Sequence, residues 1–137
     1  MEPFASIENL ENLKVYQLSR ELGKLVWGIV IRWDYLAKKT IGDQWIRATD
    51  SMSANIAEGY GRFFFNDTIK FYYYARGSYF ESYDWFLKAR ERKLLSESEI
   101  EQYQKLTEQI PKEINILIKR TRNNAKKYKG QDNKLIN

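Results

Sequence analysis

Residues 44–62 read QWIRATDSMSANIAEGYGR, and this stretch decides the fold. Small residues and one amide recur along it, at Ala48, Ser51, Ala54 and Asn55. Such a composition is typical of a helix that packs closely against its neighbours. We interpret Gly59-Tyr60-Gly61 as the stop of this helix rather than a phosphate-binding loop, because anion sites favour helix N-termini. The stretch therefore indicates packing rather than catalysis.

Helical periodicity extends from this stretch to both sides, and the chain contains only 2 prolines. We expect a first helix from Asn9 or Asn12 to about Trp33, a link from Asp34 to Gly42, a second helix from Asp43 to Ala57, a third from Asn66 or Asp67 to Lys93, and a fourth from Ser96 to Arg122. Ser96 begins a capping-box sequence, and Pro111 should kink or break the fourth helix. The pattern predicts an all-α, antiparallel, up-and-down four-helix bundle over residues 1–123 and a basic, flexible tail over residues 124–137.

The composition excludes most catalytic and metal-binding chemistry. The chain has no cysteine and no histidine, so it lacks thiolates and the commonest general base and zinc ligand. Catalysis would need carboxylates, lysine or tyrosine, and no pairing of these has a recognisable spacing. We therefore expect no enzyme, no cofactor, no metal and no small-molecule substrate. The start lacks a signal-peptide pattern and the longest apolar run, residues 25–31, is far too short to span a membrane, which predicts a cytoplasmic protein.

The net charge of +5 is concentrated at the C-terminal end. Residues 1–118 hold 16 Lys and Arg against 17 Asp and Glu, whereas residues 119–137 hold seven against one. A basic segment on a near-neutral body can supply affinity for RNA or DNA. The candidate nucleic-acid-binding residues are Lys119, Arg120, Arg122, Lys126, Lys127 and Lys129. The alternative is that these cations serve solubility and the helix C-terminus.

Aromatic residues crowd the predicted third helix, with 13 between Tyr60 and Phe86. We assign one stripe to the bundle core: Ile69, Tyr72, Tyr73, Phe80, Tyr83 and Leu87. The remaining aromatics would then project outward as a homo-oligomer interface formed by Phe71, Tyr74, Tyr79 and Phe86. An alternative is that bases stack on exposed rings beside cations, although acidic residues are mixed among those cations.

A polar cluster is predicted around the end of the second helix. Asn55 and Glu58 share a helix face, and Arg62 could reach back to Glu58 or Glu81. We favour a structural network that fixes helix register over a site that binds a ligand or phosphate.

Three motifs stand out together: residues 10–18, residues 44–62, and Ala75-Arg76-Gly77-Ser78 with Glu81. In these motifs the chain resembles the bacterial 23S rRNA-intervening-sequence protein family. Ser82, Tyr83 and Asp84 depart from the leucine, glutamate and threonine expected there. The resemblance implies a four-helix bundle, often assembled as a ring-like homopentamer, and assigns no catalytic residues.

These observations favour a scaffold formed by several copies of this chain. The scaffold would bind RNA or DNA through the basic C-terminal segments. The alternative is a protein-interaction adaptor that uses the aromatic third helix and has no nucleic-acid role.

Overall fold

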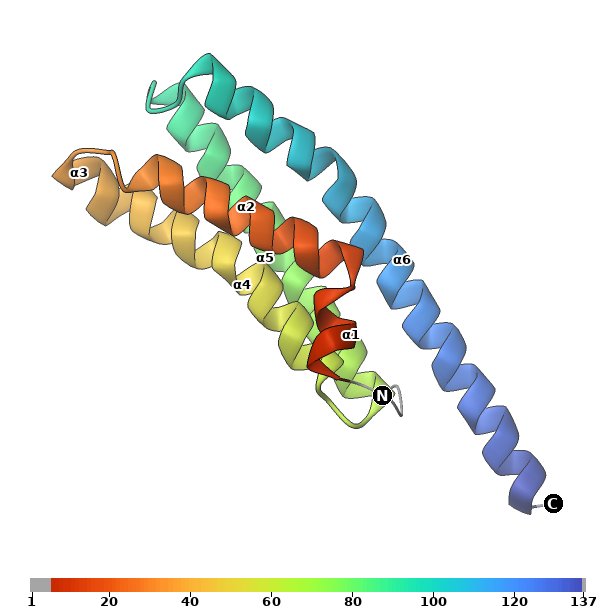
Figure 1. The fold of residues 1–137 in the computed structure, drawn as a ribbon. Coiled ribbons are helices and arrows are strands. Elements are labelled where there is room, and N and C mark those ends of the chain that lie inside the picture. Colours follow the sequence, from red (N-terminus) through yellow and green to blue (C-terminus); the bar gives the residue numbers. More distant parts are fainter. Residues whose placement is uncertain (1–5, 137) are drawn as a thin grey trace.

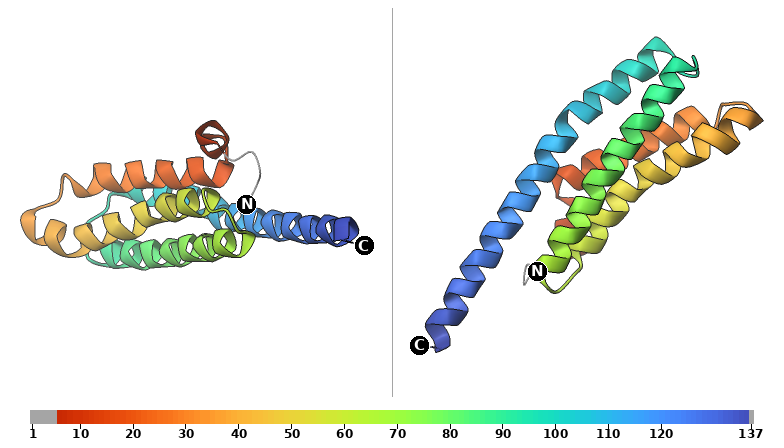
Figure 2. Two further views of the ribbon diagram at one scale, coloured as in Figure 1. Left: turned by 90° about the horizontal axis from the view of Figure 1, so that it is seen from below. Right: turned by 180° about the vertical axis from the view of Figure 1, so that it is seen from behind.

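A computed structural model describes residues 6–136, with side chains described as far as Tyr128. Four long helices pack as an up-and-down bundle: α2 (Lys14–Val30), α4 (Asp43–Tyr60), α5 (Phe65–Glu91) and α6 (Glu97–Ile136). Helix α2 contacts α4 and α6, and α5 contacts the same two helices, so the four form a closed cycle of neighbours (Figures 1 and 2). The predicted all-α bundle is confirmed for the single chain.

The predicted first helix is in fact two helices. Helix α1 (Ile7–Glu11) begins at Ser6, whose Oγ accepts a hydrogen bond from the Asn9 N–H at 3.1 Å. Leu13 has an extended backbone with φ −68° and ψ 122°, and α2 begins after it. The predicted starts at Asn9 and Asn12 are therefore wrong. The break lets the half-buried Leu13 pack against the bundle core.

The predicted link between residues 34 and 42 is largely helical. Asp34 Oδ1 accepts from the Ala37 N–H at 3.0 Å and caps the short α3 (Tyr35–Ala37). A π-helical turn, η1 (Lys38–Gly42), then leads directly into α4. Gly42 is buried, and a Cβ added there would lie 2.6 Å from a methyl carbon of Val30, so the turn closes tightly on α2.

The ends of the later helices follow local sequence signals. Helix α4 ends at Tyr60 with Gly61 as its C-cap. The capping box before α6 is confirmed: Ser96 Oγ accepts from the Glu99 N–H at 3.1 Å, and Glu99 Oε1 accepts from the Ser96 N–H at 2.8 Å. Pro111 lies inside α6 and does not end it, and the helix continues past Arg122 to Ile136.

The face that α5 turns to the core differs from the predicted stripe. Its buried residues are Thr68, Tyr72, Ala75, Tyr79, Ser82, Phe86 and Ala89. Four of these seven are small, because α5 packs closely on its neighbours and leaves little room for large side chains. Tyr73 and Phe80, predicted to be core, are exposed instead. The predicted stripe is wrong at these two positions and right at the buried Tyr72. Close contact between helices, which favours small residues, decides much of what this helix buries.

Candidate nucleic-acid interface

The C-terminal half of α6 carries the predicted basic residues on its outer surface. Leu117, Ile118 and Thr121 are buried against the bundle, which leaves the other sides of the helix to solvent. The exposed cations there are Lys119, Arg120, Arg122, Lys126 and Lys127, while the side chain of Lys129 lies outside the described residues. The sequence holds no Asp or Glu between Glu113 and Asp132. Because α6 runs past the end of the other helices, this surface is accessible from several directions (Figure 1).

Arg122 connects the basic surface of α6 to α5. Its Nη2 donates a hydrogen bond to the hydroxyl of Tyr73, and its Cζ lies 5.5 Å from the centroid of the Tyr73 ring. Tyr128 packs on Phe65 at the start of α5, with 5.6 Å between ring centroids. The basic segment is thus held beside the outer surface of the aromatic helix.

The outer surface of α5 presents three rings around a glycine. Tyr73, Tyr74 and Phe80 are 42%, 48% and 53% exposed. Gly77 lies between them, three or four residues from each, so the rings surround it on the helix surface. Each ring has a cation beside it, as Lys70 Nζ lies 5.8 Å from the Tyr74 centroid and Arg76 Cζ lies 5.4 Å from that of Phe80.

Two residues of the predicted oligomer interface lie in the core. Tyr79 is 8% exposed and Phe86 is not exposed at all, so their predicted outward position is wrong. Phe86 stacks on Tyr103 with ring centroids 4.2 Å apart. Of the other two, Tyr74 is on the surface and Phe71 is half-buried, with the Arg62 guanidinium 4.7 Å from its centroid.

The predicted polar cluster forms only in part. Arg62 Nη2 lies 2.6 Å from Glu58 Oε1, as expected for residues one helical turn apart. Asn55 donates to the Ser51 carbonyl of its own helix at 2.9 Å. Glu81 accepts from the Trp85 indole at 3.3 Å and lies ten residues along α5 from Phe71, on which Arg62 packs, or about 15 Å. The four residues therefore do not form one network.

A chain of buried hydroxyl groups joins three helices, and the sequence did not predict it. Ser82 Oγ lies 2.7 Å from Thr49 Oγ1 and 2.8 Å from the Tyr103 hydroxyl. Burial raises the pKa of Tyr103 well above its ordinary value of 10.0, although the hydrogen bond with Ser82 lowers it. A tyrosine held neutral in this way suits a structural role rather than that of a base or nucleophile.

Comparison with known protein families gives one match. The family model of the 23S rRNA-intervening sequence protein matches residues 11–116. The chain belongs to this family. The match ends before Lys119, so the basic surface of this family member lies outside the matched region. A search of curated proteins found no match.

The structure of this family member also has an apolar surface at the α2–α3 end that was not predicted from the sequence. Its exposed residues, which we call the tip patch, are Trp27, Ile31, Tyr35 and Leu36. The first three line a hollow of about 580 Å³, and Lys39 Nζ lies 5.0 Å from the Tyr35 centroid. The four-residue spacing of Trp27 and Ile31 marks a second apolar face of α2, and this signal was available in the sequence.

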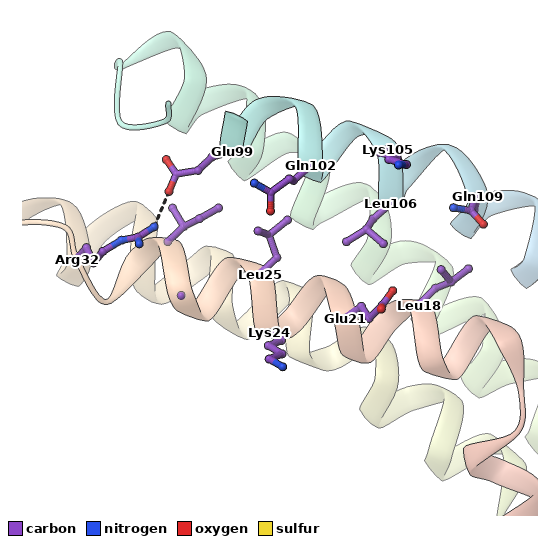
Figure 3. Close-up of a pocket in the computed structure, with 12 residues that line it drawn as sticks. Leu18, Glu21, Lys24, Leu25, Arg32, Glu99, Gln102, Lys105, Leu106 and Gln109 are labelled. Carbon is purple, nitrogen blue, oxygen red and sulfur yellow. Dashed lines mark hydrogen bonds and ion pairs between the residues drawn. The ribbon is translucent and has the colours of Figure 1, made fainter. Parts of the chain in front are cut away.

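A groove of about 790 Å³ separates α2 from the first half of α6 (Figure 3). Leu18, Leu25 and Leu106 contribute apolar side chains, whereas the rim is polar and carries both signs of charge. An ion pair between Arg32 and Glu99, with 2.8 Å between Nη2 and Oε2, crosses one end. In the part of the chain that the structure describes, no group of three or more acidic side chains is placed to hold a metal ion, and no helix is long and apolar enough to cross a membrane.

Proposed function

We propose that this protein is a non-enzymatic, homo-oligomeric helical scaffold of the cytoplasm that binds RNA or DNA without sequence specificity. The observation that carries the proposal is the exposed basic surface of α6, where five described cations lie on a helix that extends beyond the bundle. No acidic residue interrupts this surface between Glu113 and Asp132. Phosphate groups would be its natural ligands, since neutralising them releases condensed counterions.

Oligomerisation would strengthen this binding. A single copy offers a few phosphate contacts, which give weak and strongly salt-dependent affinity. Several copies in one assembly would bring their α6 segments to the same nucleic acid, so that each contact raises the effective concentration of the next. The ring-like homopentamer implied by the family resemblance would gather about +30 from the +6 carried by residues 119–137 of each chain.

The test is binding of labelled RNA and duplex DNA over a salt series. Substitution is better than truncation at Ile118, because Thr121 and Tyr128 pack on the bundle. The variant replaces Lys119, Arg120, Lys126 and Lys127 with glutamine. Its matched control replaces four exposed cations outside α6 with glutamine: Lys24, Arg90, Arg92 and Lys93.

We expect the α6 variant to bind weakly and to show a shallower salt dependence, by about 0.9 in log–log slope for each lost duplex phosphate contact. The control variant should bind like the native chain. Equal losses in both variants would show that general charge, not α6, is responsible.

A protein-interaction adaptor is the second candidate, and the exposed rings of Tyr74 and Phe80 are the observation that favours it. Large exposed apolar groups often mark a partner surface. An oligomer that binds no nucleic acid at low salt would favour this candidate, and the α6 cations would then serve solubility.

A further inference from the structure

We propose that the outer surface of α5 around Gly77 is a base-stacking site for single-stranded nucleic acid. We call Tyr73, Tyr74 and Phe80 the ring platform. The inference rests on the proposed function and narrows its ligand, because a non-specific basic surface alone would not distinguish single strands from duplexes.

The first argument is the unused space at Gly77. A Cβ added there would meet nothing within 4 Å. Glycine is less favourable than alanine inside a helix, and here no neighbouring side chain or helix of the same chain requires its small size. By contrast, Gly59 on α4 has Phe71 and Thr68 close against it. The surface at Gly77 is therefore open to a ligand, and unlike the open surface at Gly28 it is flanked by the three rings of the platform.

The second argument is the charge around the platform. Lys70, Arg76 and Arg122 each lie beside one ring, at 5.8, 5.4 and 5.5 Å from the centroids of Tyr74, Phe80 and Tyr73. Rings that alternate with cations suit a ligand with flat bases and a negative backbone. The same face of a second copy would bring like charges together, which disfavours symmetric self-pairing through this surface.

Two acidic side chains near the ring platform restrict the path that a bound nucleic-acid strand can take. Asp84 is paired with Lys88 at 2.6 Å, and Glu81 accepts from Trp85. Both carboxylates lie toward the C-terminal end of α5, beyond Phe80. A nucleic-acid strand that leaves Phe80 and passes Tyr73 toward Arg122 on α6 would move away from these two acids.

The third argument is continuity with α6. Arg122 sits on Tyr73 and bonds to its hydroxyl, so the platform and the basic surface meet at this residue. Lys119 and Lys126 lie three residues before and four residues after Arg122, on the same side of α6. Bases stacked on the platform would thus leave their phosphates near α6. Paired bases inside a duplex do not offer their faces, so only a single strand can use both surfaces.

The experiment compares a labelled 12-nucleotide oligouridine with a duplex RNA of the same length, by fluorescence anisotropy on the full chain. The variant is Tyr74→Ala with Phe80→Ala, which leaves the Arg122–Tyr73 contact in place. Its matched control is Phe63→Ala with Phe64→Ala, which removes two exposed rings before α5. Light scattering reports the mass of each protein.

We expect the platform variant to lose about tenfold or more in affinity for the single strand. Its duplex affinity, salt slope and mass should stay at the native values, and the Phe63/Phe64 control should bind both ligands normally. Gly77→Leu should reproduce the selective loss, whereas Gly28→Leu, at another helical glycine with open space around it, should not.

Three outcomes would overturn the inference. Native affinity of the platform variant for the single strand would show that the rings take no part in binding. A fall in mass would identify the platform as an interface between copies. If the native chain binds neither ligand at low salt, the proposed function fails together with this inference. If the native chain binds the duplex and the platform variant keeps native affinity for the single strand, this inference alone fails.

Discussion

At the scale of single residues, Gly59 shows how closely α4 and α5 approach each other. A Cβ at this position would lie 2.9 Å from the Phe71 Cβ and from the Thr68 carbonyl oxygen, and 3.0 Å from a ring carbon of Tyr72. Two of these three atoms cannot move without shifting α5 itself. The glycine is thus required by the packing of the two helices.

We predict that Gly59→Ala lowers the free energy of unfolding by about 1–3 kcal/mol, as overpacking of a close contact does. The sign of this change separates the two cases, because a glycine-to-alanine substitution in an open helix interior would raise the free energy of unfolding by up to about 1 kcal/mol. Urea denaturation measures the difference. Gly61→Ala is the control, since its new Cβ meets only carbonyl oxygens at 3.5 and 3.7 Å, and it should change stability by less than about 0.5 kcal/mol.

Tyr103 makes the stability depend on pH in the alkaline range. Because burial raises its pKa above the ordinary value of 10.0, the unfolded chain loses this proton at a lower pH than the folded chain. The unfolded state then binds fewer protons, so the free energy of unfolding falls as the pH rises above about 10. Below that pH, Tyr103 is protonated in both the folded and the unfolded chain, so its contribution to the free energy of unfolding is fully present.

We predict that Tyr103→Phe flattens this alkaline fall. The variant loses the hydrogen bond to Ser82 and should be less stable than the native chain at pH 8, yet it should lose less stability between pH 9 and 11. Chemical denaturation at several pH values gives the slope. Some slope should remain, because burial also raises the pKa of Tyr79. An identical slope in both proteins would contradict the assignment.

At the scale of elements, α6 stays helical across Pro111, and a side chain of α5 supplies a hydrogen bond at this position. A residue with an N–H at position 111 would donate to the carbonyl of Thr107 in a regular helix, and proline cannot. The Tyr79 hydroxyl donates to that same carbonyl oxygen at 3.2 Å. A side chain of the neighbouring helix therefore replaces the missing backbone donor, which explains how the helix continues.

This replacement predicts a coupling between the two positions. Tyr79→Phe should cost about 1–3 kcal/mol in the native chain, because it leaves the Thr107 carbonyl buried without a donor. In a Pro111→Ala background the new N–H can take over, so the cost of Tyr79→Phe should be clearly smaller. A double-mutant cycle by urea denaturation measures the coupling. Additive effects of the two changes would show that the contact is incidental.

The same residue shows what the sequence could predict of each element. Periodicity and caps located four helices and the Ser96 capping box, since these depend on local spacing. Tyr79 was placed on the outside because it did not belong to the stripe assigned to the core, whereas its hydroxyl has a specific partner in the core. The breaks at Leu13 and the π-helical turn depend on contacts with distant helices, which no local pattern encodes.

At the scale of the whole molecule, the sequence predicted one candidate surface, the α6 cations, but not the ring platform or the tip patch. The α6 cations follow from a run of like charge, which remains on the surface in any fold. The ring platform requires knowledge of which α5 face is buried, and the tip patch requires α3 and the π-helical turn to bring Tyr35 beside α2. Surfaces formed by several elements thus become visible only when those elements are placed.

The tip patch is the surface that we expect to support self-association. It combines two exposed aromatic and two exposed aliphatic side chains around a hollow, and it lies at the opposite end of the bundle from the free end of α6 (Figure 1). Copies joined there would keep their basic segments free for nucleic acid. The ring platform, lined by cations, is less suited to this role.

We therefore predict that Trp27→Ser with Tyr35→Ser reduces the mass measured by light scattering toward the 16.4 kDa of one chain. Phe63→Ser with Phe64→Ser removes exposed aromatic surface elsewhere and should leave the assembly intact. A full-size assembly in the tip variant would exclude this patch as the contact. Nucleic-acid affinity provides a second measurement, because a monomer that retains its α6 cations should bind more weakly than the assembly, with a shallower salt dependence.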